Sequence, residues 1–127
     1  MSRVIAALFL VMASTAASWA QGLSPSVWQS ESGAILKVLR VDASGAFSGV
    51  FLSSPNNPCP VVPYDMAGGV RGLRVGFQTS RDWTSDCSLN AIWSGRFVSP
   101  ETIAVRWVAT GPGRQVRIRG SEVFHRL

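Results

Sequence analysis

The chain has 127 residues, of which 46% are hydrophobic and 15% are charged, and 12 basic residues outnumber 7 acidic residues to give a net charge of +5. This length allows one small domain. The basic excess permits attraction to anionic lipid, polysaccharide or nucleic acid. However, no aromatic residue interleaves the arginines between residues 114 and 119, which gives no support for a stacking groove for single strands. We expect these arginines on the solvated exterior and predict no nucleic-acid partner.

Residues 1–20 have the pattern of a signal peptide. Arg3 gives a positive start, an apolar run extends from Val4 to Met12, and small residues precede the expected cleavage site after Ala20. The apolar run is too short to span a bilayer, and no stop-transfer pattern follows it. A retained N-terminal anchor is the alternative. We therefore expect a domain over residues 21–127, without a membrane span, that is periplasmic or secreted.

Beyond residue 20, apolar, β-branched or aromatic runs alternate with turn signals, which is typical of a β-meander. No apolar period of 3.6 residues long enough for a helix occurs there. Closing about eight strands into a barrel removes exposed edges and leaves an interior about the size of one small ligand. The predicted strands lie near residues 26–30, 34–41, 45–53, 62–68, 72–80, 89–97, 102–110 and 114–126.

The alternation within each predicted strand assigns side chains to one face, because successive side chains point to opposite sides. Phe47 and Phe51 share a face of the third strand, Trp93 lies on the apolar face of the sixth, and Trp107 on that of the seventh. Such rings would give a barrel aromatic inner walls, which indicates a ligand pocket rather than a catalytic cleft. Glu122 falls on the apolar face of the last strand, where an unpaired charge is costly, so it needs a partner.

The chain's two cysteines, Cys59 and Cys87, lie among turn-forming residues. An even number of cysteines in an oxidising compartment predicts a disulfide. This bridge would close a loop of about thirty residues, which the chain-entropy model values at roughly 3–4 kcal/mol. Two cysteines and the single histidine, His125, cannot complete a four-ligand set without distant carboxylates, and so we predict no metal site.

Five short motifs run in series over nearly all of the chain after residue 20. They are WQSESG at residues 28–33, VD followed by GAFSG within 41–49, WSG at 93–95, IAVRW at 103–107 and GSEVF at 120–124. In order and spacing this series resembles the avidin family, the biotin-binding barrels that include streptavidin. The resemblance implies an all-β fold, an eight-stranded antiparallel up-and-down β-barrel, with biotin as its ligand.

The cysteine pair is similar to that of a subgroup of short bacterial avidins. In that subgroup a bridge ties the loop after the third strand to the loop before the sixth, and several members are dimers. The loop tryptophan that caps a neighbouring subunit's pocket in tetrameric members is missing here, with Arg114 nearest to its position. The resemblance therefore implies a homo-oligomer, with a dimer favoured over a tetramer.

The resemblance also implies where biotin would lie. Trp93 and Trp107 match wall tryptophans that sandwich the apolar part of biotin, and Ser53 matches a serine that contacts the ureido ring. Glu122 stands where the family has an Asp or Asn that accepts a ureido N–H. Ser30 stands where an Asn donates to the ureido oxygen.

Other pocket positions depart from the family pattern. Ala34 and Phe51 stand where a Ser and a Tyr would donate to the ureido oxygen. Two lost donors would cost about 1–3 kcal/mol, or roughly one to two factors of ten in affinity. Ala91 replaces a hydroxyl residue near the thioether, and Leu89 replaces a serine near the carboxylate. The family's tryptophan at the end of the fifth strand has no counterpart in register, where Thr79, Ser80 or Arg81 falls, with Trp83 nearby.

Structural interpretations of the same residues stay open. The rings of Trp93, Trp107 and Phe51 could simply fill the core, and Glu122 could pair with an inward arginine, for which Arg81 is the candidate.

Three functions follow from these patterns. The first is a secreted, non-enzymatic binder of biotin or a close analogue, with biotin a ligand rather than a cofactor. The second is a barrel retuned to a more apolar ligand, the direction in which Ala34, Phe51, Leu89 and Ala91 shift the pocket. The third is an envelope interaction module that uses the basic exterior. We predict no catalytic residues, because the sequence has no Ser/His/Asp set, paired inward carboxylates, glycine phosphate loop or metal cluster.

Overall fold

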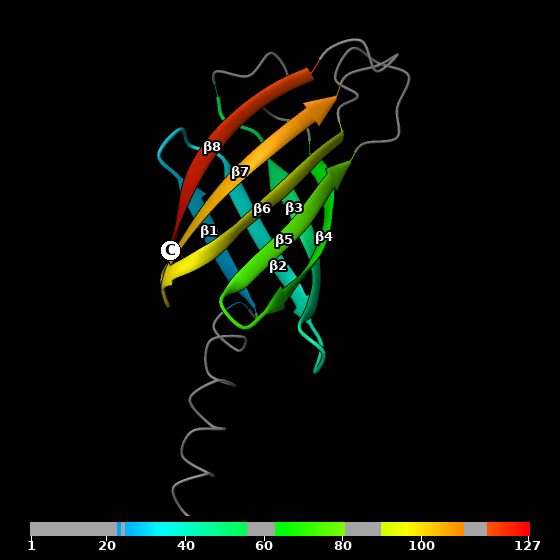
Figure 1. The fold of residues 1–127 in the computed structure, drawn as a ribbon, viewed down its shortest axis with the longest axis vertical. Helices are drawn as coiled ribbons and strands as arrows, with labels where there is room; N and C mark the ends of the chain where they lie inside the picture. The colour runs from blue at the N-terminus through cyan, green and yellow to red at the C-terminus, as the bar shows by residue number, and fades with distance from the viewer. Residues whose placement is uncertain (1–22, 24, 56–62, 81–89, 111–116) are drawn as a thin grey trace, which may run out of the picture.

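Eight antiparallel strands close into a barrel in which each strand pairs with its neighbour in sequence and the last pairs with the first (Figure 1). The structure is a computed structural model and describes residues 23, 25–55, 63–80, 90–110 and 117–127. This arrangement confirms the predicted all-β, up-and-down barrel. The strands are β1 (Ser26–Ser30), β2 (Ile35–Val41), β3 (Ala46–Leu52), β4 (Pro63–Arg71), β5 (Arg74–Ser80), β6 (Asn90–Ser99), β7 (Thr102–Thr110) and β8 (Arg117–Arg126).

Most strand ends lie within a few residues of the predicted ones, and β4 is the clearest exception. The predicted strand ended at residue 68, but β4 continues to Arg71. A Cβ at Gly68 would lie 2.1 Å from the Gly76 carbonyl oxygen of β5 and 2.5 Å from the Phe77 Cβ. Gly68 therefore serves a close approach of two strands, and the turn is made at Gly72, whose φ is +60°.

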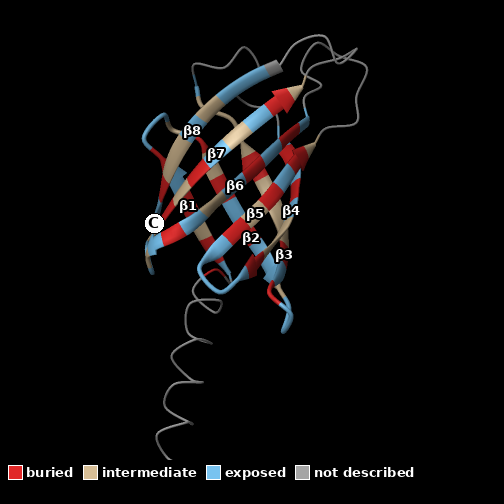
Figure 2. Ribbon diagram, viewed as in Figure 1, coloured by how far each residue is buried: buried red, intermediate tan, exposed pale blue. Residues whose placement is uncertain are grey.

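Inward and outward residues alternate along the strands, as Figure 2 shows in red and pale blue. In β6, for example, Ala91, Trp93 and Phe97 are buried, while Ile92 and Val98 between and beside them are exposed. This period of two is what a half-buried strand requires, because one face meets the barrel interior and the other meets solvent. The predicted inward faces of β3 and β6 are confirmed.

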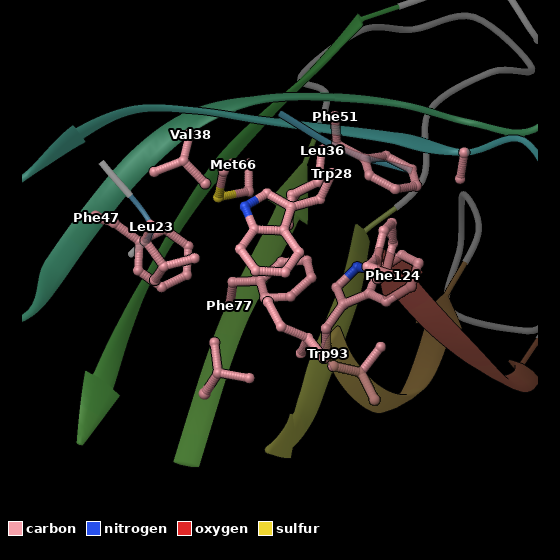
Figure 3. Packing of buried hydrophobic residues seen from close by; sticks show 14 of the residues in the cluster. Leu23, Trp28, Leu36, Val38, Phe47, Phe51, Met66, Phe77, Trp93 and Phe124 are labelled. Atoms are coloured by element: carbon pink, nitrogen blue, oxygen red, sulfur yellow. The ribbon is translucent and has the colours of Figure 1, made fainter. Parts of the chain in front are cut away.

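Large side chains fill the half of the barrel that lies toward the β2–β3 and β6–β7 turns. Trp28 is completely buried, and its Nε1 donates to the Ser26 hydroxyl at 2.9 Å. Its ring meets Phe97 edge-on, with centroids 6.1 Å apart. Leu23 is also buried, at 1% exposure, and belongs to the same cluster. Figure 3 shows side chains of this cluster, among them Trp28, Leu36 and Phe77, directed toward one another from different strands. This half of the barrel holds a packed core of buried side chains.

Several predictions fall on residues outside the described part of the chain. They are the signal peptide over 1–20, the Cys59–Cys87 disulfide, and the positions of Arg81, Trp83, Leu89 and Arg114. Among the residues that are described, no helix has the length and apolar character needed to cross a membrane. The same residues contain no group of His, Cys, Asp and Glu side chains that could hold a metal ion.

Candidate ligand-binding site

A cavity of about 210 Å³ lies inside the other half of the barrel. Its lining comes from the ends of β3, β5 and β7, from the beginnings of β4 and β6, from β8 and from Ala34 just before β2, so the cavity opens at one end of the barrel. Seven predicted site residues line it: Ala34, Phe51, Ser53, Ala91, Trp93, Trp107 and Glu122. Ser30 does not line the cavity, and Leu89 lies outside the described residues. The other lining residues are Ser54, Tyr64, Thr79, Ala109 and Ile118.

The strand register explains why this end is hollow. One inward row of residues runs across β5, β6, β7 and β8. It consists of Phe77, Trp93, Trp107 and Gly120, and we call it the aromatic row after its three rings. The next inward row toward the open end consists of Thr79, Ala91, Ala109 and Ile118. Ala91 and Ala109, which are register partners on neighbouring strands, extend only methyl groups into the interior at this level. Space therefore remains above the aromatic row, and Trp93 and Trp107 of that row form the floor of the cavity.

Trp93 belongs to both the core and the cavity. It is 5% exposed, and its ring stacks on Phe77 at 5.3 Å with an interplanar angle of 9°. Its centroid lies 5.0 Å from that of Phe51 and 5.7 Å from that of Trp107, which both line the cavity (Figure 3 shows Phe51, Phe77 and Trp93). Its Nε1 donates to the Thr79 hydroxyl at 3.0 Å, and this bond orients the indole. Trp93 therefore fills part of the core and also lines the cavity.

Trp107 is half-buried and depends on a glycine opposite it. A Cβ at Gly120 would lie 2.4 Å from Cζ2 and 2.8 Å from Nε1 of the Trp107 indole. The ring therefore occupies the space beside the β8 backbone that the missing side chain leaves. Its Nε1 is the one buried side-chain nitrogen or oxygen without a hydrogen-bond partner in the described part of the chain. Leaving a buried donor unpaired costs about 1–3 kcal/mol.

A chain of hydrogen bonds connects the β1–β2 turn to the cavity carboxylate. The Ser32 hydroxyl donates to Glu122 Oε1 at 2.8 Å, and the Ser30 and Ser32 hydroxyl oxygens are 2.9 Å apart. Because Ser32 uses its one proton on Glu122, Ser30 must donate to Ser32. Ser30 also accepts from the Ala34 backbone N–H at 3.1 Å. Ser30 thus supports Glu122 through Ser32, and its proton is already committed.

Tyr64 is a cavity residue that the sequence analysis missed. It lies directly opposite Phe51 in the β3–β4 register, with ring centroids 6.2 Å apart, and is 4% exposed. Alternation in β4 places Tyr64 on the same inward face as Met66, and this signal was present in the sequence. That the Tyr64 ring lies next to Phe51 follows only from the pairing of β3 with β4.

No protein-family model matches the chain, and no curated protein is a detectable relative. Solved structures with the same fold are found. A variant of shwanavidin in complex with biotin has a TM-score of 0.72 at 23% identity, covering 81% of this chain and 95% of that chain. The rhizavidin–biotin complex has a TM-score of 0.69 at 24% identity, covering 82% and 92%. The bradavidin2–biotin complex has a TM-score of 0.68 at 23% identity, covering 81% and 96%. The barrel therefore has the avidin-like fold.

Proposed function

We propose that this avidin-like barrel is a non-enzymatic binding protein that holds biotin or a close analogue in the open-end cavity. The observation that carries the proposal is the lining itself. One cavity of about 210 Å³ is lined by the residues that the sequence resemblance assigns to biotin, namely Trp93, Trp107, Ser53 and Glu122. The similar structures of shwanavidin, rhizavidin and bradavidin2 with biotin support the same ligand class.

The cavity offers biotin an apolar floor and a small number of polar groups, as ligand sites usually do. The indole faces of Trp93 and Trp107 would pack against the apolar ring, and Glu122 would accept a ureido N–H. Donors to the ureido oxygen are fewer than in the family pattern, since Ala34 and Phe51 have none and the Ser30 proton is bonded to Ser32. Three missing donors would weaken binding by about 1.5–4.5 kcal/mol, or roughly 10- to 2,000-fold.

Isothermal titration calorimetry with biotin on the oxidised, full-length protein tests the proposal. We expect one biotin per chain. Ala91→Leu, which fills the cavity from the row above the floor, should abolish the heat of binding while the barrel stays folded. The matched control is Ile92→Ala on the outward face of the same strand, which should bind like the wild type. Absence of both heat and thermal shift at millimolar biotin would refute the proposal.

A second candidate is a more apolar ligand, and the row of Ala91, Ala109 and Ile118 near the opening favours it. The side chains of Ala91, Ala109 and Ile118 offer no hydrogen bond to the outer part of a ligand. A thermal-shift panel of biotin against medium-chain fatty acids separates the two candidates. A larger shift with biotin than with every fatty acid would reject the second.

We further propose export with cleavage after Ala20, a Cys59–Cys87 disulfide and a dimer. The sequence patterns described above support each of these. Mass spectrometry of the exported protein, with and without reduction, tests the first two. Light scattering of the purified protein tests the dimer, and a monomer or tetramer mass would reject it.

A further inference from the structure

The cavity and the outer surface of the protein differ in the sign of their charge. The chain carries a net charge of +5, and arginines such as Arg74, Arg96 and Arg106 are exposed on the outer face. Glu122 is the one charged residue among the described residues that line the cavity. A carboxylate beside aromatic rings has lost part of its hydration, and it gains most from a partner that is cationic and donates hydrogen bonds.

The hydrogen bonds around Glu122 leave one of its oxygens for a ligand. Oε1 accepts from Ser32, and Oε2 has no hydrogen-bond partner among the described residues. The same bonds hold the carboxylate in place, because Ser32 is in turn bonded to Ser30 and Ser30 to the Ala34 backbone. The β1–β2 side of the cavity therefore presents an oriented acceptor, with the Ser30 proton unavailable to a ligand carbonyl.

Four aromatic rings line the same cavity as Glu122. Phe51, Tyr64, Trp93 and Trp107 all line the cavity and form a continuous group, with neighbouring centroids 6.2, 5.0 and 5.7 Å apart. The faces of such rings attract cations, and tryptophan does so most strongly. A carboxylate and several aromatic faces around one cavity are chemically suited to an organic cation.

We propose that the cavity prefers a planar cationic head group of the guanidinium or amidinium type. An N–H of the head group donates to Glu122 Oε2, and its plane lies over the aromatic floor. Ser30 and Ser32 are positioning residues for the carboxylate. The inference concerns the cavity of the proposed function but does not require that the natural ligand be biotin.

The pair of biotin and 2-iminobiotin tests this preference at pH 7. The two compounds share ring and side chain, but 2-iminobiotin replaces the ureido carbonyl by an imino group that is protonated to a cyclic guanidinium. We expect calorimetry to show that 2-iminobiotin binds the full-length protein about 10- to 100-fold more tightly than biotin, the gain of one charge-assisted hydrogen bond.

Glu122→Gln keeps an oxygen for Ser32 and removes the charge, and it should abolish the preference. The matched control is Glu101→Gln, which neutralises an exposed carboxylate in the β6–β7 turn outside the cavity lining and should leave the preference unchanged. Thermal denaturation confirms that both variants fold. Ser32→Ala should lower 2-iminobiotin affinity less than Glu122→Gln does, because the charge remains but its orientation is lost.

The outcomes separate this inference from the proposed function. Biotin bound as tightly as 2-iminobiotin or more tightly overturns the inference and leaves the proposed function standing. An ion pair between Arg81 and Glu122 would give that result, and Arg81→Gln would then move the preference toward 2-iminobiotin. Binding of 2-iminobiotin without biotin supports the inference and rejects biotin as the ligand. Binding of neither compound overturns both.

Discussion

The two ends of this barrel share one backbone pattern but differ in what their inward positions carry. Toward the β2–β3 turn, those positions hold large apolar side chains that meet across the interior, among them Trp28, Phe97 and Phe124, each no more than 3% exposed. Toward the opposite end, they hold small residues such as Ala34, Ala91 and Ala109, and a cavity of about 210 Å³ remains. The volume of the inward side chains, rather than the strand geometry, thus decides which end of the barrel has a cavity.

Three tryptophans show the same difference between the packed end and the cavity end of the barrel. Trp28 is sealed in the core, and its N–H is satisfied by Ser26. Trp107 is half-buried at the cavity, and its N–H is unsatisfied. Trp93 lies at the boundary, where one ring contacts Phe77 below and lines the cavity above. A tryptophan with complete packing and hydrogen bonding contributes stability, whereas one that lacks part of both leaves surface for a ligand.

The largest expected effect is that of Trp28→Ala in the packed end. Removing a fully buried tryptophan should lower the free energy of unfolding by about 3–5 kcal/mol, as measured by urea denaturation. Trp107→Ala should cost no more than about 2 kcal/mol, since that ring is only half-buried, but should reduce ligand affinity at least ten-fold. Equal losses of stability in the two variants would contradict the division of the barrel into a packed end and a binding end.

Gly120→Ala should move the Trp107 indole without deleting it. The new Cβ would lie 2.4 Å from the indole carbon Cζ2, and the ring must shift toward the cavity. We expect ligand affinity to fall about ten-fold and the free energy of unfolding to fall by about 1–3 kcal/mol, with a change in near-ultraviolet circular dichroism. The control is Gly76→Ala in β5, where the nearest atom to a new Cβ is 3.7 Å away. An unchanged affinity in Gly120→Ala would mean that the ligand does not contact Trp107.

Ala109→Val should have opposite effects on stability and binding. Ala109 is 5% exposed and lies in the row above the cavity floor, where two added methyl groups can fill empty space. Such filling should raise the free energy of unfolding by up to about 1.5 kcal/mol, at roughly 0.8 kcal/mol per buried carbon, and should weaken ligand binding. If Ala109→Val is more stable than the wild type and binds the ligand with the same affinity, the ligand binds outside this cavity.

The comparison of the two ends also shows how far sequence reasoning reaches. Alternation within single strands predicted the barrel and the inward direction of Phe51, Trp93 and Trp107. It did not show that Tyr64 is beside Phe51, because that contact depends on the β3–β4 register. It also could not show that Ser30 gives its proton to Ser32, because this requires the geometry of the turn around Gly33, whose φ is +93°. Contacts between strands and hydrogen-bond directions come from the folded barrel alone.

The smallest expected effect belongs to the β2–β3 turn at the packed end. There Asp42 Oδ1 accepts hydrogen bonds from the Ser44 hydroxyl and from the backbone N–H groups of Ser44 and Ala46. The bonds from the Ser44 side chain and backbone, the two largest causes, lower the pKa of Asp42 below its ordinary value of 3.8, because they favour the charged form.

The folded state therefore binds the Asp42 proton more weakly than the unfolded state does. The stabilising contribution is complete above the unfolded pKa of 3.8 and is lost as the pH falls through the lower folded pKa. Asp42→Asn keeps an oxygen acceptor that does not titrate. Its melting temperature should be slightly below that of the wild type at neutral pH, and the two should converge in acid. A difference in melting temperature that stays constant into acid would contradict the role of the charge.

Because Asp42 lies at the packed end, Asp42→Asn should bind the ligand with unchanged affinity at neutral pH. A weakened affinity would show that the two ends of the barrel are coupled.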